Sequence, residues 1–371
     1  MTNNIIYIGL DVDDANFHGC ALEPSTGEAL TFKCRPTVKG LIRQINKIQK
    51  AFPHHEVTLC YEATYIGNTL KRDLHAHNIA CDVVAPSSIP QVRGKKIKTD
   101  RIDAAQLARF YANGLLTAVS IPDEEQEMDR DLLRSRNKLQ DIQSDLRRHI
   151  HGLLRRNNRH FKLETDHKAH WTGPHYRWLD KVVKESAGSF KSNLILLLKQ
   201  LKDIDLTVKE YQKEIDTLAQ SLRYKSKVEA LTCYKGIRNL FAMTMITEIG
   251  DIKRFEHPRS LVSWMGLDIR EYSSGGKHNR FGITKQGNKH LRHAIVEANQ
   301  KGYRSLTTTN ALNARRKDTE PELIRIADRC HRRLHQKGGH LLKMGKHPNK
   351  VKVACAREMV GFIWESLQKV A

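Results

Sequence analysis

Two aspartates stand three residues apart where a basic stretch of the sequence leads into a predicted helix. Asp100 and Asp103 belong to the segment Lys95–Arg109, KKIKTDRIDAAQLAR. A spacing of three residues places two side chains on one face of a helix. The two carboxylates would repel each other there unless a cation lay between them, and a divalent metal ion meets that need. The alternative is an ordinary helix start, where the helix dipole favours acidic residues.

Basic residues flank the same pair of aspartates. Lys95, Lys96 and Lys98 come directly before them. Such a cluster attracts a polyanion, so we expect these lysines to contact the phosphates of a nucleic acid. The metal ion and the phosphate would then meet at one place.

The sequence before this segment predicts strands that carry two more carboxylates. Residues 5–12 form a short β-branched run with Asp11 near its end, and Glu62 follows a similar run over residues 57–61. If these two strands are neighbours, four carboxylates converge at one edge of a sheet. The predicted order is strands over 5–12, 16–23 and 29–34, a helix over 38–52, a strand over 57–61, a helix over 68–77, a strand over 79–84 and the aspartate helix.

A cluster of four carboxylates needs bound cations. Mg²⁺ or Mn²⁺ is the expected cofactor, because both ions prefer hard oxygen ligands. Two such ions can activate an attacking oxygen and stabilise a leaving oxygen at phosphorus. The expected ligands are Asp11, Glu62, Asp100 and Asp103.

The motifs around these acids resemble a known protein family. IGLDV contains Asp11, CYEAT contains Glu62, and KTDRIDA contains both aspartates of the helix. In this order they resemble the RuvC-like, ribonuclease-H-like domain of the DEDD insertion-sequence transposases. The resemblance implies a recombinase that cuts and rejoins donor and target DNA, chosen by a non-coding bridge RNA. It also implies homodimers that assemble into tetramers.

The charge of the chain indicates a polyanionic partner. The formal net charge is +22 and the isoelectric point is about 9.7. Residues 1–125 are neutral, whereas residues 126–225 carry +7 and residues 226–371 carry +15. We therefore expect the second and third of these regions to lie against nucleic acid. No long uncharged apolar run and no cleavable leader is visible, so the expected location is cytoplasmic (bacterial or archaeal, nucleoid-associated) with no membrane partner.

Apolar heptads dominate the middle of the chain. Leu132, Leu139, Leu146 and Leu153 fall seven residues apart, and a second heptad set runs from Leu194 to Leu222. Two long helices with such stripes should pair, either as a hairpin within one chain or with a second subunit. The family resemblance favours dimerisation.

Histidines and aromatic residues separate the two heptad segments. A zinc site is one interpretation, but no cysteine lies nearby and the spacing fits no common zinc motif. A basic, aromatic loop that stacks on unpaired bases is the favoured one. The residues concerned are His160, His167, His170, His175, Trp171, Tyr176 and Trp178.

A serine-glycine segment among cations stands out in the last third of the chain. Residues 272–276, YSSGG, predict a flexible polar turn. A serine on such a turn could attack a phosphodiester while the cations stabilise the added negative charge. Turns of this composition are usually only structural. The cations are Arg270, Lys277, Arg280, Lys285, Lys289 and Arg292.

The same segment extends the family resemblance. GLDIREYSSGG, followed by GITKQGNKHLRHA, is similar to the C-terminal block of these transposases. The resemblance implies that Ser274, directly before Gly275, is the nucleophile that forms a covalent 5′-phosphoserine link to DNA. Ser273 is the second choice.

The sequence thus predicts three regions. Residues 1–125 form an α/β ribonuclease-H-like (RuvC-like) domain, residues 126–225 long coiled-coil helices with the histidine-containing insertion, and residues 226–371 a mainly α domain with the serine. The leading function is a mobile-element recombinase. The alternatives are a structure-selective nuclease that uses metal-activated water and a nucleic-acid-binding protein that has lost catalysis.

Overall fold

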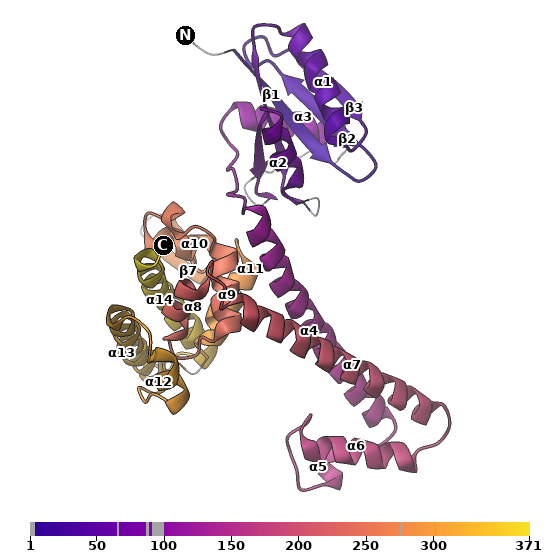
Figure 1. Cartoon of the computed structure of the whole chain (residues 1–371), viewed down its shortest axis with the longest axis vertical. Coiled ribbons are helices and arrows are strands. Elements are labelled where there is room, and N and C mark those ends of the chain that lie inside the picture. The colour runs from indigo at the N-terminus through magenta and orange to yellow at the C-terminus, as the bar shows by residue number, and fades with distance from the viewer. Residues whose placement is uncertain (1–3, 65–66, 87–88, 91–99, 275–276, 301) are drawn as a thin grey trace. The chain divides into compact units, whose positions relative to one another are not determined.

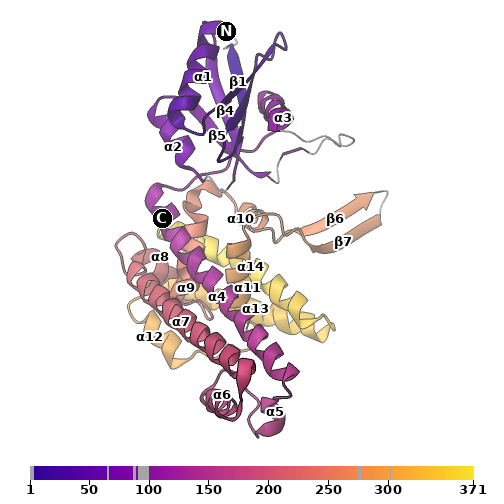
Figure 2. The same cartoon turned by 90° about the vertical axis from the view of Figure 1, so that its right-hand side faces the viewer.

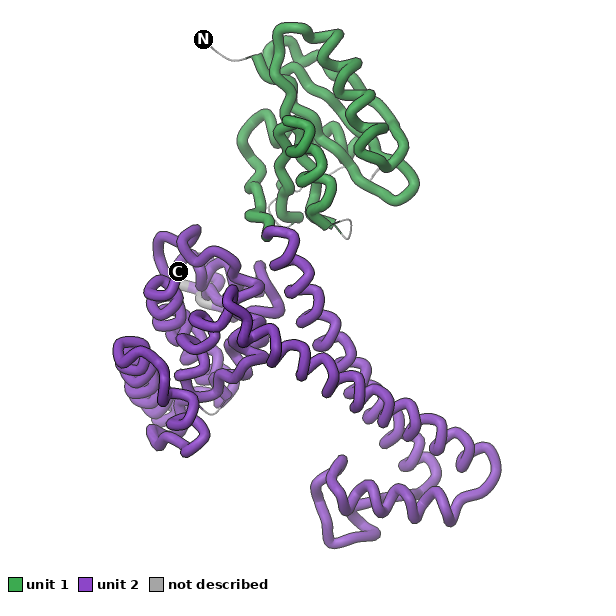
Figure 3. The backbone as a smooth tube through the Cα atoms, in the orientation of Figure 1, with its two compact units in different colours: residues 1–122 green, residues 123–371 purple. Residues whose placement is uncertain are grey.

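The computed structural model describes residues 4–64, 67–86, 89–90, 100–274, 277–300 and 302–371. The chain forms two compact units, residues 1–122 and 123–371 (Figure 3). Each unit is described by itself below.

A five-stranded mixed sheet forms the centre of the first unit. Its strands are β1 (Ile5–Val12), β2 (Phe17–Leu22), β3 (Ala29–Cys34), β4 (Glu56–Glu62) and β5 (Ala80–Val84). Their order is β3-β2-β1-β4-β5. β1 is antiparallel to β2 and parallel to β4. The predicted neighbourhood of the strands that carry Asp11 and Glu62 is therefore confirmed, as is the α/β class of this unit.

Helices cover both faces of the sheet (Figure 2). α1 (Val38–Ala51) and α2 (Thr69–Ala76) lie on one face, and α3 (Asp100–Ala112) lies on the other. Side chains alternate along a strand, so Ile8 and Leu10 of β1 pack with Leu41 and Ile45 of α1 in one buried cluster. Gly9 lies on the opposite face, toward α3.

Two long helices form a hairpin within the second unit (Figure 1). α4 (Glu124–Arg156) packs along α7 (Gly188–Leu218), and short α5 (Phe161–Glu164) and α6 (Gly173–Glu185) lie at the end of the hairpin. The pairing shows that one chain can cover its own heptad stripes. Whether a second subunit adds to it stays a prediction.

The predicted heptad stripe of the first long helix is confirmed at its C-terminal end, where Leu153 is buried and Leu146 packs against the same cluster, but not in its first half. Leu132 and Leu139 are only half-buried, whereas Leu133 and the polar Arg136 and Gln143 are buried. Arg136 donates to Gln140 Oε1 at 2.8 Å, and Gln143 hydrogen bonds with Asp205 of α7. Polar residues can occupy a helix seam when they have partners, and apolar spacing alone cannot identify them.

The remainder of the second unit is mainly helical, as predicted. Buried side chains of α9, α11 and α14 share one hydrophobic core. Among the described residues, no helix is long and apolar enough to cross a membrane. The elements are α8 (Lys225–Thr232), α9 (Asn239–Ile249), a 3₁₀ turn (Ile252–Arg254), α10 (Pro258–Trp264), β6 (Ile269–Ser274), β7 (Lys277–Ile283), α11 (Lys289–Ala298), α12 (Asn310–Arg316), α13 (Pro321–Lys343) and α14 (Pro348–Lys369).

A two-stranded ribbon projects from these helices (Figure 2). β6 and β7 pair antiparallel, with Tyr272 opposite Asn279 and Ser274 opposite Lys277. The prediction of a polar turn over residues 272–276 was therefore too broad, because Tyr272 to Ser274 belong to a strand. Residues 275 and 276 lie outside the described residues.

Candidate active site

Asp11 and Glu62 lie beside each other at the carboxyl ends of two parallel strands. Leu10 of β1 pairs with Tyr61 of β4, and the two acids are the next residues of their strands. Both side chains are partly buried. Their neighbourhood follows from the strand order alone.

The other two carboxylates come from α3, the helix that packs on one face of the sheet. Asp100 and Asp103 occupy its first turn, on the face of the sheet that Asp11 also faces. Burial raises the pKa of Asp11, and the negative charges of Asp100, Asp103 and Glu62 raise it further. The four predicted carboxylates therefore share one electrostatic environment, which is the arrangement that attracts a cation.

Gly9 lets α3 approach the sheet closely enough to form this cluster. A Cβ atom on Gly9 would lie 2.3 Å from the carbonyl oxygen of Ala104 and 2.3 Å from the amide nitrogen of Ala108. Both are backbone atoms of α3, so the clash could be relieved only by moving the helix. Gly9 is therefore a positioning residue for Asp100 and Asp103.

We expect Gly9→Ala to lower the free energy of unfolding by about 1–3 kcal/mol, the usual range for an overpacked site. It should also reduce Mg²⁺-dependent DNA cleavage, because the displaced helix separates the aspartates from Asp11. Thermal unfolding and cleavage rates measure the two effects. Gly339→Ala is the matched control, since a Cβ there meets no atom within 4 Å. Unchanged cleavage by Gly9→Ala would contradict the positioning role.

His18 joins the cluster, although the sequence did not single it out. It lies opposite Asp11 in the β1–β2 pairing, and its Nδ1 is 3.4 Å from Oδ2 of Asp100. The sequence did contain a signal for this placement. The short turn predicted after the first strand brings the second strand back beside Asp11, so His18 could have been expected opposite it. A lone histidine in a short strand carries no motif of its own.

The donor types fit a hard divalent cation, but among the described residues no three of these ligand atoms lie within 4.8 Å of one another, so the side chains would have to draw together around an ion. Carboxylate oxygens dominate the donor set, and an imidazole lies at its border. The side chain of Asp100 is 64% exposed, so the cluster is open to solvent and to a phosphate. Lys95, Lys96 and Lys98, the predicted phosphate contacts, lie outside the described residues.

Ser274 belongs to the second unit, at the end of β6. Its neighbour Ser273 is exposed and donates a hydrogen bond from Oγ to Oε1 of Glu271 at 2.7 Å. Ser273 is thus engaged with a carboxylate. The choice between Ser274 and Ser273 as the nucleophile stays a prediction.

The predicted cations of this region occupy different settings. Lys277 and Arg280 are positions of β7, while Arg270, Lys285 and Lys289 are exposed. Arg292 is partly buried and donates to the carbonyl oxygen of Met265 at 2.8 Å. Its guanidinium thus supports the base of the ribbon.

A buried ion cluster fixes the base of the ribbon to α4. Glu248 of α9 is 2% exposed and accepts hydrogen bonds from Arg134 Nε at 2.8 Å and Arg134 Nη2 at 2.9 Å. Asn288, the N-cap of α11, donates to Glu248 Oε2 at 2.6 Å. Burial alone would raise the pKa of Glu248, but the Arg134 and Asn288 hydrogen bonds and the charges of Arg134 and Arg130 hold it below its usual value.

Comparisons with known proteins cover both halves of this arrangement. A family model described as "Transposase IS116/IS110/IS902 family" matches residues 228–313. The model of the IS110-type DEDD domain, described as "Transposase", matches residues 8–158. The first match includes the ribbon, and the second includes all four carboxylates.

Curated relatives match over most of the chain. The putative transposase y4qE of Sinorhizobium fredii is 33% identical over 88% of this chain and 78% of its own length. The transposase for insertion sequence element IS1533 of Leptospira borgpetersenii is 30% identical over 90% of this chain and 95% of its own. The transposase for insertion sequence element IS1111A of Coxiella burnetii is 26% identical over 63% of each. With an acidic cluster on a ribonuclease-H-like sheet, a helical C-terminal region and relatives of this extent, the chain belongs to the IS110/IS116 family of transposases.

Proposed function

We propose that this transposase cuts and rejoins donor and target DNA through a covalent phosphoserine intermediate. The observation that carries the proposal is the convergence of Asp11, Glu62, Asp100 and Asp103 on one sheet edge. Bound there, Mg²⁺ or Mn²⁺ would activate the attacking oxygen and stabilise the leaving oxygen at phosphorus. Ser274 supplies the nucleophile from the ribbon of the second unit.

The proposed cleavage exchanges one phosphate ester for another. The Oγ of Ser274 attacks phosphorus, the bond from phosphorus to the 3′ oxygen breaks, and the proton lost by the serine is balanced by the proton that the 3′ oxygen gains. The DNA 5′ end stays joined to the protein. In the second step, the 3′ hydroxyl of another strand attacks this phosphoserine, and Ser274 regains its proton. The ester energy is conserved, so rejoining needs no ATP.

This chemistry requires the two units to meet at one phosphate. The carboxylates belong to residues 1–122 and Ser274 to residues 123–371. The composite site forms within one subunit or between two subunits of a dimer or tetramer. The exposed Arg270, Lys285 and Lys289 would contact the DNA backbone beside the serine.

A non-coding bridge RNA is the proposed guide for donor and target selection. The net charge of +22 supports a nucleic-acid partner but does not distinguish RNA from DNA. Sequencing the RNA that copurifies with the protein from its host tests this part. Recovery of a single RNA from the element itself would support it, and recovery of only bulk cellular RNA would contradict it.

The decisive experiment traps the covalent intermediate. The DNA is labelled on the 3′ side of the cleavage site, in the fragment whose new 5′ end would be joined to the protein. Incubated with the protein and Mg²⁺, it should yield a labelled protein-DNA band on a denaturing gel. Ser274→Ala should abolish this band, whereas Ser273→Ala, the matched control, should retain it. If Ser273→Ala lost the band and Ser274→Ala retained it, the nucleophile would be Ser273.

A structure-selective nuclease is the second candidate, because the acidic cluster lies entirely within the first unit and could activate water without the serine. It predicts nicked DNA with no adduct, and equal nicking by Ser274→Ala. That result would reject the phosphoserine mechanism while leaving the metal cluster in place.

A further inference from the structure

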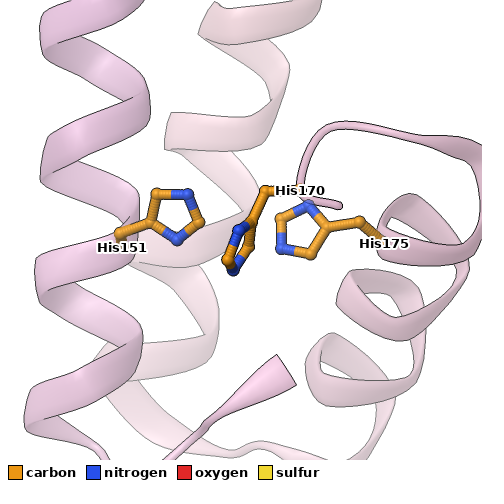
Figure 4. A group of neighbouring side chains, drawn as sticks. All are labelled: His151, His170 and His175. Carbon is orange, nitrogen blue, oxygen red and sulfur yellow. The ribbon is translucent and has the colours of Figure 1, made fainter. Parts of the chain in front are cut away.

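Three histidines converge at the end of the helical hairpin, far in sequence from both halves of the proposed active site. His151 comes from α4, His170 from the loop after α5, and His175 from α6 (Figure 4). One ring nitrogen of each lies within 4.8 Å of the others. His160 and His167, which the sequence grouped with them, are not members of this cluster, and His151 was missed.

The surroundings of His175 indicate a ligand-binding role. This residue is fully buried, and its Nδ1 accepts a hydrogen bond from the Trp171 amide at 3.1 Å. Its Nε2, which points toward His170 in Figure 4, has no hydrogen-bond partner in the described part of the chain. A buried polar atom without a partner is costly, and a bound ligand is one way to satisfy it.

A cavity of about 220 Å³ adjoins the three rings. Arg155 and Arg159 also line it, together with Phe161. The space is large enough for a metal ion with a bound water or anion on its open side. The positive charges of Arg155 and Arg159 favour an anion in this cavity. They disfavour a metal cation that binds without such an anion.

The three rings are uncharged, which is the charge state that metal binding needs. Burial lowers the pKa of His151 and of His175 to about 4, with smaller effects from neighbouring cationic and histidine groups. Burial also lowers the pKa of His170. All three rings are therefore neutral near pH 7, and a neutral imidazole can offer a nitrogen lone pair to a metal.

We propose that His151, His170 and His175 bind a first-row transition metal ion, Zn²⁺ foremost, as a clamp at the end of the hairpin. Three imidazoles without carboxylates favour Zn²⁺ over Mg²⁺. Tetrahedral coordination brings ligand nitrogens to roughly 3.3 Å from one another. The rings therefore move slightly inward on binding, and water or an anion from the cavity takes the fourth position.

Binding has a local consequence that can be measured. Because the Trp171 amide donates to Nδ1 of His175, the proton of this ring sits on Nε2, the atom that faces the other histidines. Metal binding at Nε2 moves this proton to Nδ1, the other nitrogen of the neutral ring, so Nδ1 can no longer accept from the Trp171 amide and that hydrogen bond breaks. Trp171 has a left-handed backbone with φ of 60° and lies 5.0 Å from the His151 and His175 rings. Its fluorescence should therefore report binding.

The clamp would join elements that otherwise share only a small core. The cluster at this end contains Phe161, Trp178, Leu179 and Leu194 among its buried residues. Trp178 is 6% exposed and stacks on His175 with ring centroids 5.6 Å apart. The earlier interpretation of a base-stacking aromatic loop therefore cannot extend to Trp178. A small core is the setting in which a structural metal contributes most.

Metal titration of the full-length protein tests the proposal. All samples carry Asp11→Asn to weaken binding at the acidic cluster. Zn²⁺ is titrated against a chromophoric indicator, and Co²⁺ is followed by its visible absorption and by quenching of tryptophan fluorescence. We expect one tight Zn²⁺ site, weakened at least about 100-fold by His151→Gln or His170→Gln. We also expect Zn²⁺ to slow hydrogen exchange over residues 160–185.

His160→Gln is the matched control, because His160 lines the same cavity outside the cluster. Unchanged binding by this variant supports the assignment. The proposal would be overturned if the Asp11→Asn protein with all three histidines had no tight Zn²⁺ site, or if adding His151→Gln left its Zn²⁺ affinity unchanged. The three rings would then serve only as aromatic packing. The inference does not depend on the phosphoserine mechanism, and its readouts do not require DNA cleavage.

Discussion

Asp11→Asn is expected to lower the rate of Mg²⁺-dependent DNA cleavage by about 1,000-fold and to raise the melting temperature of the metal-free protein. The loss is roughly 4 kcal/mol of transition-state stabilisation, since a metal ligand is removed. The gain in stability has a separate cause. Burial and three neighbouring carboxylates raise the pKa of Asp11, so its ionised form disfavours the folded state until a cation is bound.

Two measurements distinguish this result from simple misfolding. Mg²⁺ should raise the melting temperature of the parent protein more than that of Asp11→Asn, because a ligand stabilises the state that binds it. Asp13→Asn is the matched control, since Asp13 is exposed in the turn after β1. It should leave both cleavage and the Mg²⁺ effect unchanged. Parent-like cleavage by Asp11→Asn would remove the basis for a catalytic metal cluster.

The strands of the first unit could be predicted because their local signals agree with their environment. The β-branched run over residues 5–12 is central and buried, and the predicted strand over residues 57–61 differs from β4 by only one residue at each end. The adjacency of Asp11 and Glu62 was conditional on strand order, which depends on long-range pairing. The role of Gly9 was not predictable, because it depends on which helix packs against that face.

The second unit shows where sequence patterns lose information. A heptad pattern identifies a helix, but it does not decide which of two neighbouring positions, such as Leu132 and Leu133, faces the partner helix. In the first half of α4 the buried positions include the polar Arg136 and Gln143, each of which hydrogen bonds with another side chain. His331 illustrates the same limit, because it stands among Arg329, Arg332 and Arg333 in the sequence, a composition typical of a solvated helix. It is nevertheless 4% exposed, and its Nε2 accepts the Lys235 amide at 2.8 Å.

The histidine cluster required three-dimensional information for a different reason. His170 and His175 are close in sequence, but the third member comes from α4, on the other side of a helix-loop connection. Known zinc motifs have ligand pairs at short spacing, whereas this arrangement has one such pair and a distant single histidine. Only the fold brings His151 to the others.

Glu248→Ala is expected to lower the free energy of unfolding by roughly 3–5 kcal/mol, the range for removing one partner of a buried ion pair. The change leaves Arg134 and Arg130 without their shared carboxylate, and it leaves Asn288 without its acceptor. Chemical denaturation measures the loss. Glu248→Gln should lose less, because an amide oxygen can still accept from Asn288. Glu365→Ala is the matched control, since its partner Arg329 is 54% exposed, and its expected cost is about 0–1 kcal/mol.

The same substitution should affect catalysis through the ribbon. The side-chain Oδ1 of Asn288 caps α11 by accepting a hydrogen bond from the Leu291 amide at 2.9 Å. The backbone amide of Asn288 donates to the carbonyl oxygen of Trp264 at 3.1 Å. Loss of Glu248 frees this side chain and loosens the segment that follows β7. At a temperature where the variant stays folded, phosphoserine adduct formation should therefore fall more than the folded fraction does, and hydrogen exchange should rise over residues 284–291. A variant that loses stability but keeps its adduct yield would show that α4 holds the domain together without positioning Ser274.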